Sequence, residues 1–168
     1  MTTNNEKHLR AYEQMLSHAK DLLASAKRGM TPGLEKILEA SREKVSEIEE
    51  LSVEELDKIS NYLRRDIYDV ANYMAENGGE LRDWLRFDIQ QVEERILESL
   101  SLLADPTNVD LAEFREQANL LTEWHTGEIT GPGTLVCETC GEEIHFHKTG
   151  HIPPCPKCKG TRYNRPVD

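Results

Sequence analysis

All four cysteines of the chain lie in one stretch, CETCGEEIHFHKTGHIPPCPKC, at positions 137 to 158. They form two Cys-x-x-Cys pairs, Cys137 with Cys140 and Cys155 with Cys158, separated by fourteen residues. Two residues between cysteines allow a tight turn to aim both sulfurs at one ion, and four thiolates at about 2.3 Å make a tetrahedral zinc site. The gap between the two pairs is slightly shorter than the usual range of roughly 15 to 20 residues. A short hairpin between the pairs would accommodate this gap. The stretch therefore predicts one structural Zn²⁺ per chain, with these four cysteines as ligands.

Other chemistries of the same thiols stay open as alternatives. Iron could occupy the same cage, and the pairs could be redox thiols or disulfides. A catalytic zinc is disfavoured because such a site keeps an open coordination position, and four cysteines leave none. A structural metal would also stabilise the fold of the C-terminal segment. Some 40 residues with few apolar side chains form too small a core to fold alone, and zinc binding can provide roughly 10 to 16 kcal/mol.

The residues around the cysteines predict a zinc ribbon. Gly141 follows the first pair and Lys159-Gly160 follows the second, where the turn needs a left-handed or unhindered backbone. Short strands are predicted at residues 134–136, 144–147 and 161–163. We interpret His145, His147 and His151 as exposed residues of loops or strands. The alternatives are that they contact a partner or form a second metal site.

The N-terminal part predicts helices, because apolar residues recur at spacings of three and four. The expected helices cover residues 6–28, 32–48, 53–74, 81–103 and 111–124. Ser52-Val53-Glu54-Glu55 fits a capping box at the start of the third helix. The predicted fold is mainly α: an elongated antiparallel bundle or coiled-coil hairpin with a small C-terminal β zinc ribbon.

The composition changes after Thr126, where Gly131-Pro132-Gly133 cannot continue a helix. We expect an acidic helical domain over residues 1–126 and a zinc ribbon over 127–168. The segment Gly127–Gly133 is interpreted as a linker strand that packs the ribbon on the helices, with a specific binding loop as the alternative. Trp124 and His125 are expected to pack at that junction.

The formal net charge of -11 lies entirely in the helical part, which carries 26 acidic against 15 basic residues through His125. Such a surface repels phosphate backbones, so most of the molecule is not expected to bind nucleic acid. Four cations lie near the C-terminus: Lys157, Lys159, Arg162 and Arg165. We interpret them as solvated or as paired with acidic groups of the same chain. The alternatives are that they bind nucleic acid or an acidic protein. An acidic cluster is interpreted as a solvated face: Glu47, Glu49, Glu50, Glu54 and Glu55.

The sequence lacks the patterns of several functional classes. We find no glycine-rich phosphate loop and no nucleophile beside a base, so the chain is not expected to be an enzyme. The apolar runs are only a few residues long, and MTTNNEKHLR does not follow the plan of a signal peptide. These patterns predict a cytoplasmic protein without membrane contact.

Three motifs resemble the C-terminal signature of bacterial zinc-ribbon-containing proteins of unknown function. They are HTGEITGPGTLVCETC at 125–140, CPKC at 155–158 and YNRP at 163–166, and Leu63-Arg64-Arg65-Asp66 adds a helical match. The resemblance covers nearly the whole chain, strongly after His125 and loosely before it. It implies a cytoplasmic zinc protein with an acidic helical N-terminal part and no assigned reaction.

The function expected from these observations is a non-enzymatic zinc protein whose ribbon serves as an interaction or adaptor module for an unidentified protein partner. One alternative is a nucleic-acid- or ribosome-associated factor that uses the basic tail. Another is a redox-switched chaperone in which oxidation expels zinc. A homodimer through the helical part is compatible with the apolar seams.

Overall fold

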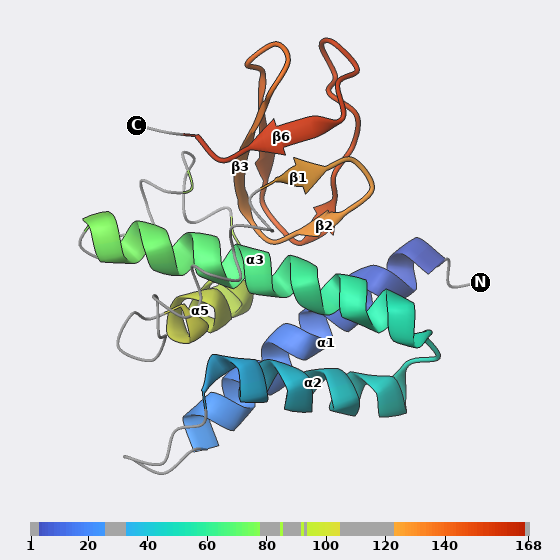
Figure 1. The fold of residues 1–168 in the computed structure, drawn as a ribbon. Helices are drawn as coiled ribbons and strands as arrows, with labels where there is room; N and C mark the ends of the chain where they lie inside the picture. The colour runs from blue at the N-terminus through green and yellow to red at the C-terminus, as the bar shows by residue number, and fades with distance from the viewer. Residues whose placement is uncertain are drawn as a thin grey trace.

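A computed structural model of the chain describes residues 4–25, 33–77, 85, 92, 94–104 and 123–166. Within these residues, helices come first along the chain and short strands follow (Figure 1). The helices are α1 (Asn4–Ser25), α2 (Leu34–Ile48), α3 (Val53–Asn77) and α5 (Glu94–Leu103). The strands are β1 (Trp124–His125), β2 (Ile129–Thr130), β3 (Gly133–Cys137), β4 (Glu143–Phe146), β5 (Gly150–His151) and β6 (Arg162–Asn164). The predicted combination of a mainly helical chain and a small C-terminal β part is confirmed.

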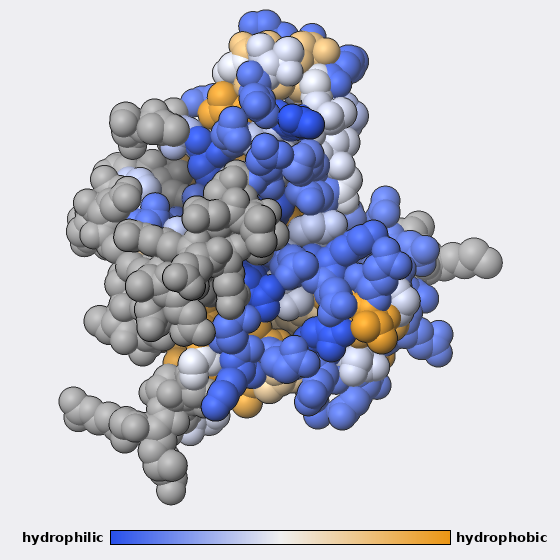
Figure 2. Space-filling model, viewed as in Figure 1, coloured by the Kyte–Doolittle hydropathy of each residue, from blue (hydrophilic) through white to orange (hydrophobic). Residues whose placement is uncertain are grey.

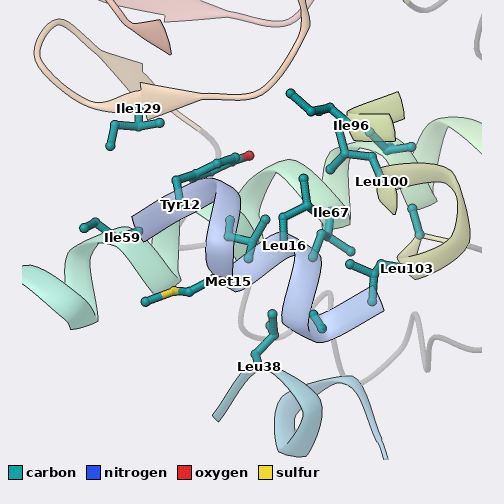
Figure 3. Packing of buried hydrophobic residues seen from close by; sticks show 14 of the residues in the cluster. Tyr12, Met15, Leu16, Leu38, Ile59, Ile67, Ile96, Leu100, Leu103 and Ile129 are labelled. Carbon is teal, nitrogen blue, oxygen red and sulfur yellow. The ribbon is translucent and has the colours of Figure 1, made fainter. Parts of the chain in front are cut away.

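Helix α1 lies at the centre of the helical part and contacts α2, α3 and α5. Its apolar residues recur every three or four positions, so one face is buried along the helix, including Tyr12, Met15 and Leu16. Figure 3 shows these side chains beside Leu38 of α2, Ile67 of α3 and Leu100 of α5. The described helices therefore share a single apolar core.

Helix α3 begins at the capping box that the sequence predicts. The Ser52 amide donates to Glu55 Oε2 at 2.9 Å, and the Glu55 amide donates to Ser52 Oγ at 3.1 Å. These two hydrogen bonds satisfy amides that have no partner within the helix. The capping residues thus fix where α3 starts, directly after the α2 to α3 turn.

The arrangement of the helices is less regular than the predicted antiparallel bundle or coiled-coil hairpin. In Figure 1, α1 runs obliquely behind α2 and α3. The elongated coiled-coil hairpin is not confirmed and stays a prediction.

Two predicted helices need correction. A single helix over residues 81–103 is wrong at Val92, which lies in a bend, and α5 begins only at Glu94. Trp124 was predicted as the last residue of a helix, but it lies in β1, because its backbone pairs with Tyr163 of β6. Residues 111–122 of that predicted helix lie outside the described residues.

The strands form a four-stranded antiparallel sheet with the order β1-β6-β3-β4 and a two-stranded sheet of β2 and β5. β3 pairs along its length with β4, and Cys137 at its end is opposite Tyr163. The three strands predicted from the sequence are confirmed as β3, β4 and β6, except that His147 lies beyond β4. The domain boundary near residue 126 stays a prediction, and β1 joins the sheet just before it.

The C-terminal β part has a small core of its own and sits over α3 (Figure 1). The buried residues of this core are Trp124, Leu135, Cys137, Ile152, Cys155 and Tyr163. Ile129 of β2 instead belongs to the helical core, where Figure 3 shows it above Tyr12. One side of the β part is therefore fixed against the helices and the other carries the cysteines.

The coloured surface in Figure 2 is largely hydrophilic, with small separate apolar areas. The exposed large apolar side chains of the described residues are Leu22, Ile48 and Val53. Among the described helices, each is too short or too polar to cross a bilayer.

Candidate metal centre

The first Cys-x-x-Cys pair forms a tight turn at the end of β3. The Gly141 amide donates to the Cys137 carbonyl at 2.9 Å, and the Cys137 amide donates to the Glu142 carbonyl at 2.8 Å. Gly141 has a φ of 79°, in the left-handed region where a side chain is costly. The glycine after CETC is therefore required by the backbone of this turn.

The second pair repeats the same geometry. The Lys159 amide donates to the Cys155 carbonyl at 2.9 Å, and the Cys155 amide donates to the Gly160 carbonyl at 2.8 Å. Here the left-handed residue is Lys159, with a φ of 64°. Gly160 is needed for space instead, because a Cβ there would lie 3.2 Å from the sulfurs of Cys137 and Cys158. The expected left-handed and unhindered positions are thus both present.

The two turns bring all four cysteine sulfurs together, within 4.8 Å of one another. The sulfurs of Cys137 and Cys158 are 3.5 Å apart, and those of Cys140 and Cys155 are 3.6 Å apart. A tetrahedron with zinc-sulfur bonds of 2.3 Å has sulfur-sulfur edges of about 3.8 Å. The cysteines are free rather than paired as disulfides. The spacing therefore fits a single tetrahedral metal ion.

The electrostatics of the sulfurs also favour a cation between them. Backbone amides, that of Cys140 foremost, lower the pKa of Cys137 to about 6. The Gly160 amide lowers the pKa of Cys158, but the adjacent Cys137 sulfur and burial outweigh it and raise that pKa to about 12. Four thiolates this close repel one another, and a divalent cation removes that penalty.

The three histidines lie away from the sulfurs. The Thr134 hydroxyl donates to the Leu85 carbonyl at 2.6 Å and lies 2.8 Å from His145 Nδ1. His151 Nε2 lies 3.0 Å from the Asn5 carbonyl of α1, while His147 is exposed. Within the described part of the chain, the four cysteines are the one group of three or more ligand residues close enough to share an ion.

The structure also reveals a buried polar cluster that the sequence analysis did not assign: Tyr12, Arg65, Asp66, Trp124 and Glu128, here called the docking network. The Arg65 and Asp66 side chains are 3% and 2% exposed, and Arg65 Nε donates to Asp66 Oδ1 at 3.2 Å. Arg65 also donates to Glu128 Oε1 at 2.9 Å and to the Ile129 carbonyl at 2.7 Å. No local pattern marks this cluster, because the Glu128 and Ile129 partners of Arg65 lie 63 and 64 residues away in the chain.

Asp66 accepts hydrogen bonds from three separate segments. The Tyr12 hydroxyl donates to Oδ2 at 2.5 Å, the Gly131 amide to Oδ2 at 3.0 Å, and Trp124 Nε1 to Oδ1 at 3.1 Å. Burial, followed by the charge of Asp66, raises the pKa of Tyr12 well above its usual value, so the phenol remains a donor. This carboxylate therefore ties α1, α3 and the β part together.

The segment Gly127–Gly133 packs the β part on the helices, as its linker interpretation predicts. Glu128 accepts from Arg65 and from the His125 amide, both at 2.9 Å. Gly131 leaves little room for a side chain, because a Cβ would lie 3.1 Å from the Tyr12 hydroxyl oxygen. Gly131 thus serves close contact with α1 and α3, whereas Gly127 has a φ of 93° and open space where a Cβ would lie.

Of the four C-terminal cations, Arg165 is internal. Its Nε lies 2.8 Å from Asp69 Oδ2, and its guanidinium carbon lies 4.9 Å from the centre of the Trp124 ring. Lys157, Lys159 and Arg162 are exposed, and Lys157 faces Glu142 at 3.9 Å. Internal compensation, the preferred interpretation, is therefore correct for Arg165.

A small antiparallel sheet with two cysteine turns at one end, whose four sulfurs converge, defines the zinc-ribbon class of protein. The chain belongs to the family described as "Zinc-ribbon containing domain", which matches residues 5–166. The family resemblance seen in the sequence is confirmed. The family and the four-cysteine cluster together indicate zinc binding.

Curated relatives from Escherichia coli are similar to part of the chain. The "Uncharacterized protein YbeL" of strains K12 and O157:H7 is 34% identical over 70 residues, covering 39% of this chain and 41% of the relative. The matched segment thus spans about two fifths of these relatives. No solved structure matches the chain.

Proposed function

We propose that the protein is a non-enzymatic zinc protein in which Cys137, Cys140, Cys155 and Cys158 hold one structural Zn²⁺. The convergence of four sulfurs within 4.8 Å is the observation that carries this proposal. Four cysteines complete a tetrahedral coordination shell, so no position stays open for substrate or water. The ion would hold the two turns together and complete the small core in which Cys137 and Cys155 are buried.

The proposed role of the ribbon is to present a rigid surface to a protein partner. The exposed tip consists of both cysteine turns, with Glu138, Thr139, Pro156 and Lys157 facing solvent. The docking network fixes the opposite side of the ribbon on α3, which would limit the conformational entropy lost when a partner binds. The mixed charge of the tip suits a protein partner better than a phosphate backbone, which requires an excess of cations.

Metal analysis of the purified protein tests the zinc proposal. We expect one zinc per chain in the wild type prepared under reducing conditions, and less than half of that in Cys155→Ser. His147→Ala serves as the matched control, because His147 is exposed beyond β4, away from the sulfurs, and should retain full zinc. A wild-type protein without bound transition metal contradicts the proposal.

Affinity capture tests the proposed interaction role. Wild type, Cys155→Ser and a tip variant, Thr139→Ala with Lys157→Ala, are compared as bait at equal concentration. A partner bound by wild type and lost by both variants supports recognition through the tip. A nuclease-sensitive signal that weakens steeply with salt would instead favour the nucleic-acid alternative.

The finer architectural proposal is that the helical part forms a hairpin that a second copy completes. Leu22 on α1 is 39% exposed and would lie in such an interface. Sedimentation of wild type and Leu22→Glu distinguishes a monomer from a dimer. A concentration-dependent dimer that forms in wild type and is lost in the variant supports the proposal. A monomer in both proteins contradicts it.

A further inference from the structure

Trp124 belongs to two parts of the molecule at once. Its ring is buried in the small core of the ribbon beside Leu135 and Tyr163. Its Nε1 donates to Asp66 Oδ1 at 3.1 Å, and the Arg65 guanidinium carbon lies 5.0 Å from the ring centre. A change in the ribbon core therefore changes the surroundings of a buried charge pair on α3.

The charge pair depends on the ribbon for most of its partners. Arg65 and Asp66 bond each other, but Arg65 also requires Glu128 Oε1 and the Ile129 carbonyl. Asp66 receives the Trp124 and Gly131 donors from the ribbon, and from the helices it has Tyr12 in addition to Arg65. A buried charge that loses its partners is strongly destabilised unless water reaches it. The helices therefore favour a folded, docked ribbon.

The metal site connects to the same residues through the sheet. Cys137 is opposite Tyr163 in β3 and β6, and Tyr163 is opposite Trp124 in β6 and β1. Within the part of the chain that the structure describes, the ribbon core has six buried residues, two of which are Cys137 and Cys155. Such a core is too small to hold the strands in place once four unpaired thiols replace a metal centre.

We infer that zinc binding and the docking of the ribbon on α3 are coupled, so that zinc loss releases the ribbon and uncovers the face of α3 that carries Tyr62, Arg65, Asp66 and Asp69. The inference rests on the proposed zinc binding and goes beyond it, because it makes the helical part a determinant of metal affinity. Thermodynamic reciprocity requires the coupling free energy to be the same in both directions. If zinc binding stabilises the docked ribbon, docking must strengthen zinc binding by the same factor.

The two neighbouring arginines of α3 provide a matched test. Arg65 bonds the ribbon, whereas Arg64 bonds Glu35 of α2 at 2.9 Å and 2.8 Å. Zinc affinity of the full chain is measured by competition with a chromogenic chelator for wild type, Arg65→Met and Arg64→Met. We expect Arg65→Met to bind zinc about 5- to 150-fold more weakly, the usual range for coupled sites, and Arg64→Met to match wild type.

The effect of zinc on docking is tested with the wild type alone, so this experiment does not depend on the folding of a variant. Amide chemical shifts of α3 are compared by nuclear magnetic resonance before and after zinc removal. We expect large changes at Arg65, Asp66 and Asp69, and small ones at Glu35 and Ser41 of α2.

The outcomes separate the inference from the proposed function. Equal zinc affinities of wild type and Arg65→Met, or an α3 spectrum unchanged by zinc removal, would overturn the coupling and leave zinc binding intact. Asp66→Asn keeps the side-chain shape without the charge, and a loss of affinity in this variant as well supports the coupling. Wild type without zinc would overturn the proposed function and the inference together.

Discussion

At the scale of single residues, adjacent positions on α3 serve different neighbours. Successive residues of a helix are about 100° apart around its axis, so Arg64 and Arg65 point to different surroundings. Arg64 is 20% exposed and pairs with Glu35, while Arg65 is 3% exposed and bonds the ribbon. Residue type alone therefore says little about the role of either arginine.

Glu55 gives a prediction at this scale. The Ser52 amide, followed by His8, lowers the pKa of Glu55 below its usual value. A lowered folded-state pKa means that the carboxylate stabilises the fold above the unfolded-state pKa of about 4.3, and that this stabilisation is lost as the pH falls through the folded-state pKa. We expect Glu55→Gln to lower the urea midpoint at pH 7, and the two midpoints to converge as the pH falls below the folded-state pKa of Glu55.

The control for Glu55 is Glu54→Gln, which removes an exposed carboxylate from the same helical turn, where Glu54 pairs with Lys58 at 3.4 Å. Far-ultraviolet circular dichroism follows unfolding at each pH. A midpoint difference between wild type and Glu55→Gln that stays constant with pH would argue against a role for the charge in the capping box.

At the scale of elements, the two cysteine turns have the same hydrogen bonds but meet different steric demands. The first turn needs a left-handed glycine at position 141, while the second tolerates a left-handed lysine and needs a small residue at position 160. The difference arises because Gly160 approaches two of the sulfurs and its amide donates to Cys158 Sγ at 3.3 Å.

Gly160→Ala tests this packing. The new Cβ would lie 3.2 Å from two sulfurs and from Thr139 Oγ1, so the cage must widen. We expect a loss of zinc affinity of about 10- to 100-fold, typical of changes next to metal ligands. Lys157→Ala in the same turn, whose side chain faces solvent, should bind zinc as the wild type does. Equal affinity in Gly160→Ala would mean that the turn relaxes freely.

At the scale of the whole molecule, two cores of unequal strength share the chain. Among the described residues, the helical core contains 22 buried residues, of which only Ile129 comes from the ribbon. The ribbon core is far smaller and includes two cysteines. Most helical packing is therefore independent of the metal.

Zinc removal should accordingly affect the two parts differently. We expect a strong chelator to abolish the ordered strand signals of the ribbon while most of the helical circular dichroism remains. The thermal transition of the helices should shift to lower temperature, because Arg65 and Asp66 lose partners on the ribbon. A complete loss of helicity would contradict a helical core that folds without the metal.

The sequence by itself predicted the two cysteine turns, because each pair of cysteines is brought together by a turn of four residues whose geometry is local. The same holds for the start of α3, where Ser52 and Glu55 are three residues apart.

Only the tertiary structure decided how the ribbon sits on the helices. Apart from the adjacent Arg65, the partners of Asp66 lie 54 to 65 residues away in the chain. No local pattern specifies such contacts, since they arise when burial forces every charged group to find a partner. For the same reason Trp124, whose spacing fits a helix, lies in a strand paired with Tyr163.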